Sequence, residues 1–462
     1  MAFNDLREFL DFLESTGQLM RIKKPVSAKF EIAAYTRKTS DLNGPALLFE
    51  NVIDNDMPVL GGLFATRKLI ALAFGMKEET LLREYMNREN NIIDPVMVKN
   101  GPCQEIILRG NDIDLRKLPI VTNFEKDAGP YITGGVQIAK DPIKGKRNVS
   151  MHRMLLLGPK TLTVYAPPGR QLGTIISRNE DKGVGTEIAT SIGLEPATTL
   201  GSQARVPLGV DEFGIAGGLR GKAVKLVKCQ SIDVEVPDTT EIVIEGRTIP
   251  GKRVGDGPFG EYPGTYSWER PAPVLEVTAV TMRKNAIYQN VLTGTPGTEN
   301  HWMMDLPATV FAYREVFKIC PDIKDIKLTV GGTARHHCLV SIKKRHELEA
   351  RNIILALLSA PIGIKMAVVV DEDIDINDPL QVEWAVNTRV QADRDVVIVP
   401  PIYSPTLDPS SPAERTSAKF GIDATMPVEN REKFSPVWTP GQDEKYIVEE
   451  IKSFMDAVKK TK

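Results

Sequence analysis

Between about residues 103 and 300 the sequence is a series of short apolar runs separated by turn residues, and this pattern limits the folds open to the chain. The runs include EIILRG, GGVQIAK, MLLLG, LTVYAPP, AVKLVKC and EIVIEGRTI, with Gly, Pro and Asp between them. Strands at this spacing predict an antiparallel sheet or barrel rather than repeated βαβ units. One helix, at about 171–182, is expected to interrupt it.

The segment before this sheet predicts a mixed α/β region. A helix is expected over residues 5–16, begun by Asn4 or Asp5 and ended by Gly17. One face of that helix would carry Leu6, Phe9, Leu10 and Leu13. A second helical pattern covers about 67–91 with a break at Gly75, and PALLFENV and PVLGGL between the helices predict short strands.

The segment after the sheet predicts a second α/β region. A helix over 305–319 is expected to connect the two, and strands around a helix at 346–358 are typical of a parallel sheet. Residues 401–440, rich in Pro, Ser and Thr, are expected to form an extended arm before a final helix at 442–458. An acidic run is interpreted as the exposed end of a strand; it contains Asp371, Asp373, Asp375 and Asp378.

A chain of 462 residues is long for a single hydrophobic core, so several domains are expected. The patterns divide it into an N-terminal α/β domain (1–102), an antiparallel sheet or barrel (103–304), a connecting helix (305–320), a C-terminal α/β domain (321–440) and a C-terminal helix (441–462). The fold class is therefore a multidomain α+β or α/β protein.

The composition predicts a cytoplasmic protein with small-molecule partners. The net charge of -2 gives no basic surface for nucleic acid, and no run of eighteen apolar residues exists to span a membrane. The first residues, MAFNDLREFLDFLES, lack the basic start and apolar core of a secretory signal. The cysteines are far apart and are expected to be reduced; they are Cys103, Cys229, Cys320 and Cys338.

The stretch Asp256-Gly-Pro-Phe-Gly-Glu261 places two carboxylates on either side of a turn. Arg153, a charge directly before an apolar strand, needs an anionic partner if buried, and either acid would serve. An arginine opposite such a turn would keep one acid ionised, while the other could carry a proton in an apolar pocket. The three residues therefore predict either a proton-handling site or a salt bridge at a barrel mouth.

Three further groups of residues suggest ligand binding. Asn148 and Glu212 offer hard oxygen ligands suited to Mg²⁺ or Mn²⁺, although both residue types are common in loops. Arg170 at a helix start, with Lys365 at the entrance of MAVVV, would suit a phosphate, although either could be a solvated surface charge. A substrate pocket is expected near four residues, His301, Trp302, Met304 and Arg314, where a core-facing helix start is the alternative.

Taken in order, six motifs resemble the UbiD family of prenylated-FMN-dependent reversible decarboxylases. They are NVSMHR, PPGRQLG, DEFGIAGGLRG, DGPFGEYPGTY, MAVVVDEDIDI and LDPS…TSAKFGIDAT, and the resemblance runs from about residue 4 to residue 455. It implies an N-terminal α/β domain, a split β-barrel related to flavin reductases, and a C-terminal α/β domain used in oligomerisation. That division agrees with the one drawn from the residue patterns.

The resemblance also implies roles for individual residues. Arg153, Asp256 and Glu261 match the family's catalytic Arg–acid–acid network, with Glu261 as proton donor. Asn148 and Glu212 match metal ligands, and Gln171 stands where the family has a third ligand, histidine. An amide oxygen holds Mn²⁺ more weakly than imidazole does. The other cofactor-contacting positions are Ser150, Met151, His152, Arg153, Arg170 and Lys365.

The implied reaction is the reversible, non-oxidative loss of CO₂ from an aromatic, heteroaromatic or α,β-unsaturated acid. The implied cofactors are prenylated FMN and a divalent cation, Mn²⁺ or Mg²⁺, with room for a K⁺ ion. The implied partners are a flavin prenyltransferase that supplies the cofactor and further copies of the chain in a dimer or hexamer. Two alternatives remain open: a carboxylase that runs the reaction in reverse, and a catalytically silent flavin-binding assembly subunit.

Overall fold

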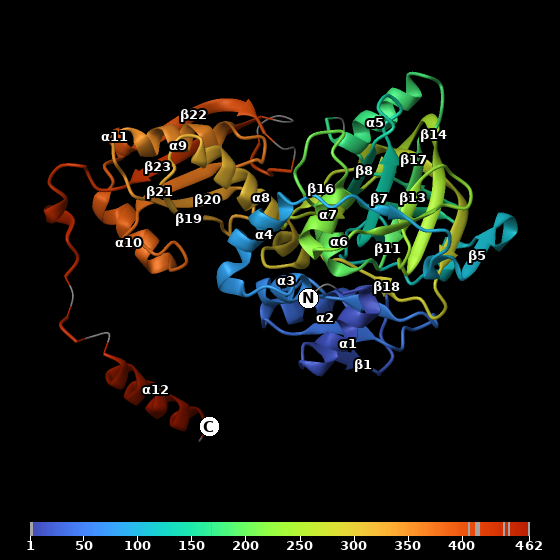
Figure 1. Ribbon diagram of the computed structural model, residues 1–462, viewed down its shortest axis with the longest axis horizontal. Helices are drawn as coiled ribbons and strands as arrows, with labels where there is room; N and C mark the ends of the chain where they lie inside the picture. The colour runs from blue at the N-terminus through green and yellow to red at the C-terminus, as the bar shows by residue number, and fades with distance from the viewer. Residues whose placement is uncertain are drawn as a thin grey trace.

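The computed structural model describes residues 3–167, 169–404, 407–411, 416–437, 439–441 and 444–460. Figure 1 shows an N-terminal region in blue, a central region in green and yellow built around a large sheet, and a C-terminal region in orange. Helix α8 (Glu299–Phe317) lies between them. In the described part of the chain, no helix has both the length and the apolar composition needed to cross a membrane.

The N-terminal region packs helices on a four-stranded sheet. The helices are α1 (Leu6–Ser15), α2 (Glu31–Asp41), α3 (Arg67–Phe74) and α4 (Leu81–Glu89), and the strand order is β1 (Leu19–Ile22), β2 (Ala46–Phe49), β3 (Val59–Gly61) and β18 (Tyr288–Gln289). Asp5 caps α1, and the four predicted apolar residues of this helix are buried. The predicted break at Gly75 is confirmed, because Gly75 ends α3 in the left-handed conformation with φ of 61°.

The central sheet confirms the predicted antiparallel architecture. Its strand order is β6 (Tyr131–Ile132), β9 (Met154–Gly158), β10 (Thr161–Thr163), β17 (Arg270–Met282), β14 (Ile242–Asp256), β11 (Glu187–Ile192), β7 (Gly135–Lys140) and β8 (Arg147–Met151), and β5 (Ile106–Arg109) also pairs with β17. Every one of these pairings is antiparallel. The sheet curls into a half-barrel (Figure 1).

Smaller elements cover this sheet and carry much of the site described below. They are the helices α5 (Gln171–Glu180), α6 (Pro196–Gly201) and α7 (Glu212–Arg220), the small sheet of β13 (Glu235–Pro237), β12 (Lys225–Lys228) and β4 (Val96–Met97), and the hairpin of β15 (Phe259–Gly260) and β16 (Tyr266–Ser267). Helix α5 confirms the helix predicted at about 171–182.

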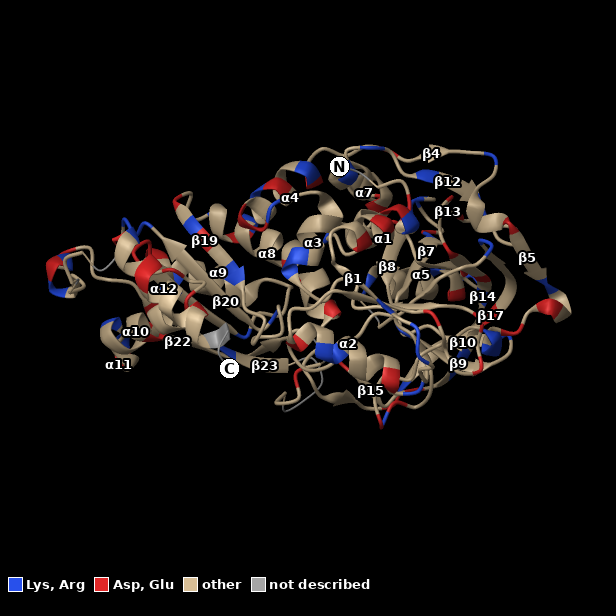
Figure 2. Cartoon of the chain, turned by 90° about the horizontal axis from the view of Figure 1, so that it is seen from below, with Lys and Arg blue, Asp and Glu red and all other residues tan. Residues whose placement is uncertain are grey.

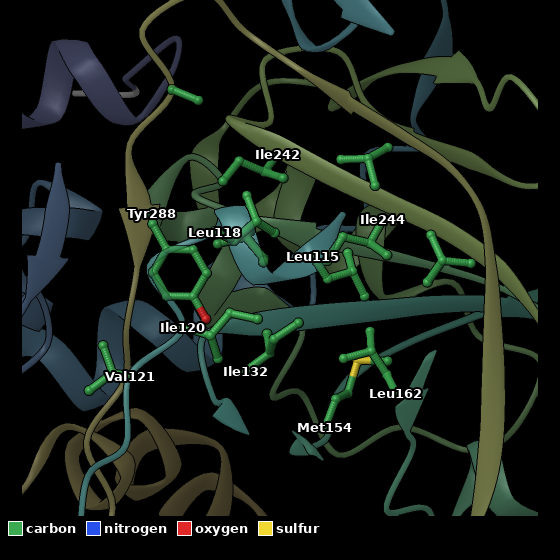
Figure 3. Close-up of a cluster of buried hydrophobic side chains, with 14 of the residues drawn as sticks. Leu115, Leu118, Ile120, Val121, Ile132, Met154, Leu162, Ile242, Ile244 and Tyr288 are labelled. Atoms are coloured by element: carbon green, nitrogen blue, oxygen red, sulfur yellow. The ribbon is translucent and has the colours of Figure 1, made fainter. Parts of the chain in front are cut away.

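The inner face of the curled sheet is filled by apolar side chains. Figure 3 shows this cluster, in which Ile132, Met154, Leu162, Ile242 and Ile244 come from the four strands β6, β9, β10 and β14. All five are fully buried. Because their strands are far apart in sequence, this core fixes the curvature that brings the ends of β8, β9 and β14 to one edge.

The C-terminal region is a five-stranded sheet in the order β19 (Ile323–Leu328), β20 (His337–Ile342), β21 (Met366–Asp371), β23 (Thr416–Ala424) and β22 (Val396–Tyr403), with α9 (Glu349–Ser359), α10 (Pro379–Arg389) and α11 (Ala392–Asp395). Strands β20, β21 and β23 are parallel, as predicted for this region. The connecting helix α8 begins at Glu299, six residues before the predicted start, and Pro307 lies inside it.

One expectation for this region is wrong, and a second holds only in part. Residues 401–440 are not simply an extended arm, because β23 lies inside the sheet between β21 and β22. The sequence does not show the polar–apolar alternation of a strand here, because the buried face of β23 carries Ser417 and Lys419. The Lys419 ammonium donates to the carbonyl oxygen of Leu358 at 2.7 Å. The acidic run is an exposed strand end only in part: Asp373 and Asp375 are exposed beyond the end of β21, whereas Asp371 is buried beside Arg389 and Asp378 caps α10.

The final helix, α12 (Lys445–Lys460), extends away from the C-terminal sheet (Figure 1). It exposes Tyr446, Ile451, Phe454 and Met455. Charges of both signs are interspersed over the chain in Figure 2. The four cysteines are free thiols, and three of them are buried.

Candidate active site at the mouth of the half-barrel

A cavity of about 630 Å³ opens where the central sheet, the N-terminal half of α8 and the C-terminal region meet. Its walls include the segment from Asn148 to Arg153, the start of α5, the loop after α6, and the segment from Phe259 to Tyr262. Arg335, directly before β20, comes from the C-terminal region. A volume of this size lies within the range of roughly 300–1,000 Å³ typical of ligand pockets.

Arg153 lies between the two carboxylates of the Asp256–Glu261 turn. It occupies the short turn from β8 to β9, Asp256 is the last residue of β14, and Glu261 directly follows β15. The Arg153 Nε donates to Asp256 Oδ1 at 2.8 Å, and Nη1 contacts Glu261 Oε1. The side chains of Arg153 and Asp256 are 5% and 0% exposed, so the network is shielded from water.

The surroundings of Arg153 hold the guanidinium in one orientation. It lies 4.1 Å from the ring centre of Tyr165 and 4.7 Å from that of Phe259, and Thr163 donates to the second oxygen of Asp256. Arg153 Nη2 is buried and has no hydrogen-bond partner among the described residues. A buried guanidinium N–H without a partner is costly, so it is suited to a ligand oxygen.

The surroundings of Glu261 raise its pKa above the ordinary value of a glutamic acid. Burial is the main cause of its raised pKa, the nearby charge of Asp256 adds to it, and Arg153 opposes both. The turn reaches this position because Gly257 has φ of 117°, a conformation that L side chains rarely adopt. A Cβ at this glycine would lie 2.9 Å from the carbonyl oxygen of Trp268.

Asn148, Gln171 and Glu212 meet in a second group on the cavity wall. They lie in β8, at the first position of α5 and at the first position of α7. The Asn148 Nδ2 donates to Gln171 Oε1 and to Glu212 Oε1, each at 3.2 Å. Burial raises the pKa of Glu212 to about 8. Among the described residues no group of three or more His, Cys, Asp or Glu side chains is placed to hold a metal ion. The group around Asn148 offers one carboxylate and two side-chain amides.

The remaining expected cofactor positions divide into two groups. Ser150, Met151, His152 and Arg170 line the cavity. His152 is neutral, because burial lowers its pKa to about 4, and its ring nitrogens contact Tyr165 O and Ser150 Oγ. Lys365 does not line the cavity; its Nζ forms an ion pair with Asp408 at 2.9 Å.

Only one of the four expected substrate residues lines the cavity. Met304 does so, whereas Trp302 packs against the core of the N-terminal region and Arg314 pairs with Glu89 at 2.8 Å. His301 is fully buried and supports the site from behind: its Nε2 contacts the carbonyl oxygen of Tyr262 at 2.7 Å. The helix start therefore faces the core at His301 and Trp302, which was the alternative interpretation, whereas Arg314 lies exposed in the last turn of α8.

Sequence reasoning missed Thr163, Tyr165, Arg205 and Arg335 as residues of the site. The first two hold the Asp256–Arg153 pair, and the two arginines line the cavity. Arg335 lies in GGTARHH, a turn-like segment with an arginine and two histidines, which is a signal that could have been followed. Arg205 lies in an unremarkable loop, SQARVP, and no local signal singles it out.

Comparisons with known proteins agree with this architecture. The N-terminal, Rift-related and C-terminal domains of the 3-octaprenyl-4-hydroxybenzoate carboxy-lyase (UbiD) family match residues 10–89, 95–296 and 301–424. The anhydromevalonate phosphate decarboxylase of Methanothermobacter thermautotrophicus is 37% identical over 429 residues, covering 92% of this chain and 99% of that protein.

Two solved structures extend the comparison. The UbiD-class enzyme HmfF from Pelotomaculum thermopropionicum, in complex with FMN, is 43% identical with a TM-score of 0.89, covering 96% of this chain and 98% of that one. The 3,4-dihydroxybenzoic acid decarboxylase of Klebsiella pneumoniae is 29% identical with a TM-score of 0.88, covering 97% and 99%. The chain therefore belongs to the UbiD family of carboxy-lyases.

Proposed function

We propose that the protein removes CO₂ from an aromatic, heteroaromatic or α,β-unsaturated carboxylic acid with the help of prenylated FMN, with Glu261 as proton donor. The observation that carries this proposal is the buried Arg153–Asp256–Glu261 network at the wall of a ligand-sized cavity. Family membership and relatives in complex with FMN and prenylated FMN support it. The same groups would serve the reverse carboxylation.

The residues around Asn148 fit the phosphate of such a cofactor together with a divalent cation. The N-termini of α5 and α7 meet there, and their free N–H groups favour an anion. The buried Glu212, whose pKa is about 8, would ionise readily beside a cation. Asn148, Gln171 and Glu212 would hold the cation, Mn²⁺ or Mg²⁺, and Arg170 would face the phosphate.

Prenylated FMN supplies an electrophilic centre that takes up the electron pair released when CO₂ leaves. The protein has two remaining tasks. Arg153, through its unpartnered Nη2, would bind the substrate carboxylate and hold it in position. Glu261 would then protonate the carbon that has lost CO₂, a role favoured by its raised pKa.

The first test is purification after co-expression with a flavin prenyltransferase, followed by a screen for CO₂ release over a panel of unsaturated and aromatic acids. Mass spectrometry should detect the modified flavin, and metal analysis should detect a divalent cation. Protein that contains neither and gains no activity on reconstitution would contradict the proposal.

We also propose that the chain forms a homo-oligomer through its C-terminal region. An amphipathic helix that extends from the chain and exposes Tyr446, Ile451, Phe454 and Met455 is unfavourable in isolation. A relative is described as an evolved dimeric form of HmfF. Light scattering should show more subunits per particle for the full chain than for a chain ending at residue 441. An equal number of subunits in both would mean that α12 does not contribute to the assembly.

A further inference from the structure

Three arginines in the cavity, Arg170, Arg205 and Arg335, form what we call the arginine cluster. They come from three separate segments: the start of α5, the loop after α6 and the turn before β20. Among the described residues, none of the three has a carboxylate within 4 Å. This is unusual for arginines in a pocket, where a partly buried charge normally pairs with an anion.

The arginine cluster lacks hydrogen-bond acceptors and negative charge. Arg335 Nε is buried without a hydrogen-bond partner, and Nη2 faces the sulfur of Met304 at 2.7 Å. Burial, with the like charges of Arg335 and Arg170, lowers the pKa of Arg205 to about 9. Three cations that destabilise one another in a pocket are stabilised when an anion binds.

The cofactor of the proposed function accounts for only part of this charge. A phosphate dianion and the Glu212 carboxylate together carry three negative charges. A divalent cation and Arg170 would offset all three, since Arg170 lies next to Gln171 at the start of α5. Arg205 and Arg335 then remain as two uncompensated positive charges in the same cavity.

We propose that Arg205 and Arg335 bind a phosphate monoester carried by the substrate, in addition to the carboxylate that Arg153 holds. This inference rests on the proposed function and narrows its substrate class to phosphorylated unsaturated acids. A phosphate offers three terminal oxygens to guanidinium groups that approach from separate walls, whereas one planar carboxylate is satisfied by one bidentate arginine.

The position of Arg335 indicates that this phosphate belongs to the substrate. Arg335 lies over the ring of Tyr262 at 4.6 Å, and Tyr262 directly follows the proton donor Glu261. The charge of Arg335 also lowers the pKa of Glu261. The bound phosphate would therefore lie within a few bonds of the reacting carbon, which favours a short substrate. It would also bridge the central region, which carries Arg205, and the C-terminal region, which carries Arg335.

The test compares a short α,β-unsaturated acid that bears a phosphate monoester with the same acid bearing the free alcohol, using the holoenzyme. The wild type should prefer the phosphorylated acid in kcat/KM. Arg205→Gln and Arg335→Gln should each reduce that preference by about tenfold or more, because a hydrogen bond to a charged group contributes about 1.5–3 kcal/mol. Arg247→Gln is the control, since Arg247 pairs with Glu187 on the outer side of the barrel.

Two measurements separate this inference from the proposed function. Calorimetric titration with inorganic phosphate should show binding to the wild-type holoenzyme that both cluster variants weaken, whether or not an acid is turned over. Flavin content should be equal in all variants. Loss of flavin in the cluster variants would assign the cluster to the cofactor phosphate and overturn the inference, as would a wild type that neither binds phosphate nor prefers the phosphorylated acid. Absence of flavin from the wild type would contradict the proposed function instead.

Discussion

The cavity contains two groups of charged side chains that differ in how their charges are balanced. In the Arg153–Asp256–Glu261 network the arginine lies between two carboxylates, and aromatic rings hold the guanidinium in place. In the arginine cluster three cations have no acidic partner among the described residues. Both groups contain arginine, and both face the same space.

The difference separates a group that the chain preorganises from one that a ligand must complete. The first network keeps its geometry without a substrate, because Asp256, Glu261 and the aromatic rings hold the Arg153 guanidinium and leave Nη2 for a ligand. Preorganised charge is usually the largest single source of enzymatic rate acceleration. The cluster has unmet hydrogen-bonding capacity, so it contributes to affinity rather than to the chemical step. Removing a network residue should therefore reduce turnover, whereas removing a cluster residue should mainly weaken binding.

Glu261→Gln should have the largest effect. The amide keeps the size of the side chain but cannot donate the proton, so turnover should fall by roughly 10²- to 10⁴-fold while the flavin stays bound. Deuterium incorporation at the former carboxylate carbon should fall in parallel. Near-normal decarboxylation would show that another group protonates the substrate.

Arg153→Ala should be comparably damaging, because it removes the proposed carboxylate contact and leaves two acids in one buried pocket without their counter-charge. Asp256→Asn should reduce turnover less, since an amide oxygen can still accept from Arg153 Nε. Steady-state kinetics with flavin content as the control would compare the two. An equal loss in both variants would mean that Asp256 does more than orient Arg153.

The pH profile of Asp256→Asn tests how the charge of Asp256 influences the pKa of Glu261. The protonated form of Glu261 is the donor, so turnover should be lost as the pH rises through its raised pKa. The charge of Asp256 contributes to that elevation. Its removal should lower the pKa of Glu261 and shift the falling limb of the kcat profile to lower pH. An unshifted limb would mean that a different group titrates.

Met304→Ala should change the relative activity across a panel of acids by about tenfold, the size of effect expected when a pocket loses apolar contact with a substrate. Met304 lines the cavity, whereas Arg314 pairs with Glu89 outside it. Arg314→Lys, which keeps the charge opposite Glu89, should therefore leave the profile unchanged. A profile altered by Arg314→Lys but not by Met304→Ala would move the substrate pocket.

Gln171→His should have the smallest effect. An imidazole in place of the amide should improve retention of Mn²⁺ during dialysis, as followed by metal analysis, with little change in turnover at saturating metal. Unchanged metal content would mean that residue 171 does not face the cation and that its contact with Asn148 has only a structural role.

Local patterns predicted the elements whose buried faces are apolar. The face of α1, the antiparallel runs of the central region and the parallel strands β20 and β21 were all confirmed. Two of the failures share a cause. Helix α2 was not predicted, since its buried face includes Thr36, Thr39 and Ser40, and β23 was hidden because it buries Ser417 and Lys419. Polar residues on a buried face interrupt the regular spacing of apolar residues by which a helix or strand is recognised in a sequence. Their hydrogen-bond partners are known only once the chain has folded.

The sequence by itself determined the residue types of the site. The acids at both ends of a Gly-Pro-Phe-Gly turn and an arginine before an apolar strand were enough to predict a charged network, because a buried arginine requires an anion. The six family motifs indicated the class of reaction, the loss of CO₂ from a carboxylic acid. Neither required knowledge of how distant segments meet.

The tertiary structure alone decided which charges lie together without partners. Arg170, Arg205 and Arg335 are separated by up to 165 positions and belong to two regions of the molecule, so no spacing in the sequence relates them. The curled sheet and the C-terminal region bring them to one cavity, while Lys365 and Arg314, equally plausible in sequence, pair with acids elsewhere. Whether an arginine is free to bind a ligand depends on its neighbours in space, which only the packing of the whole chain determines.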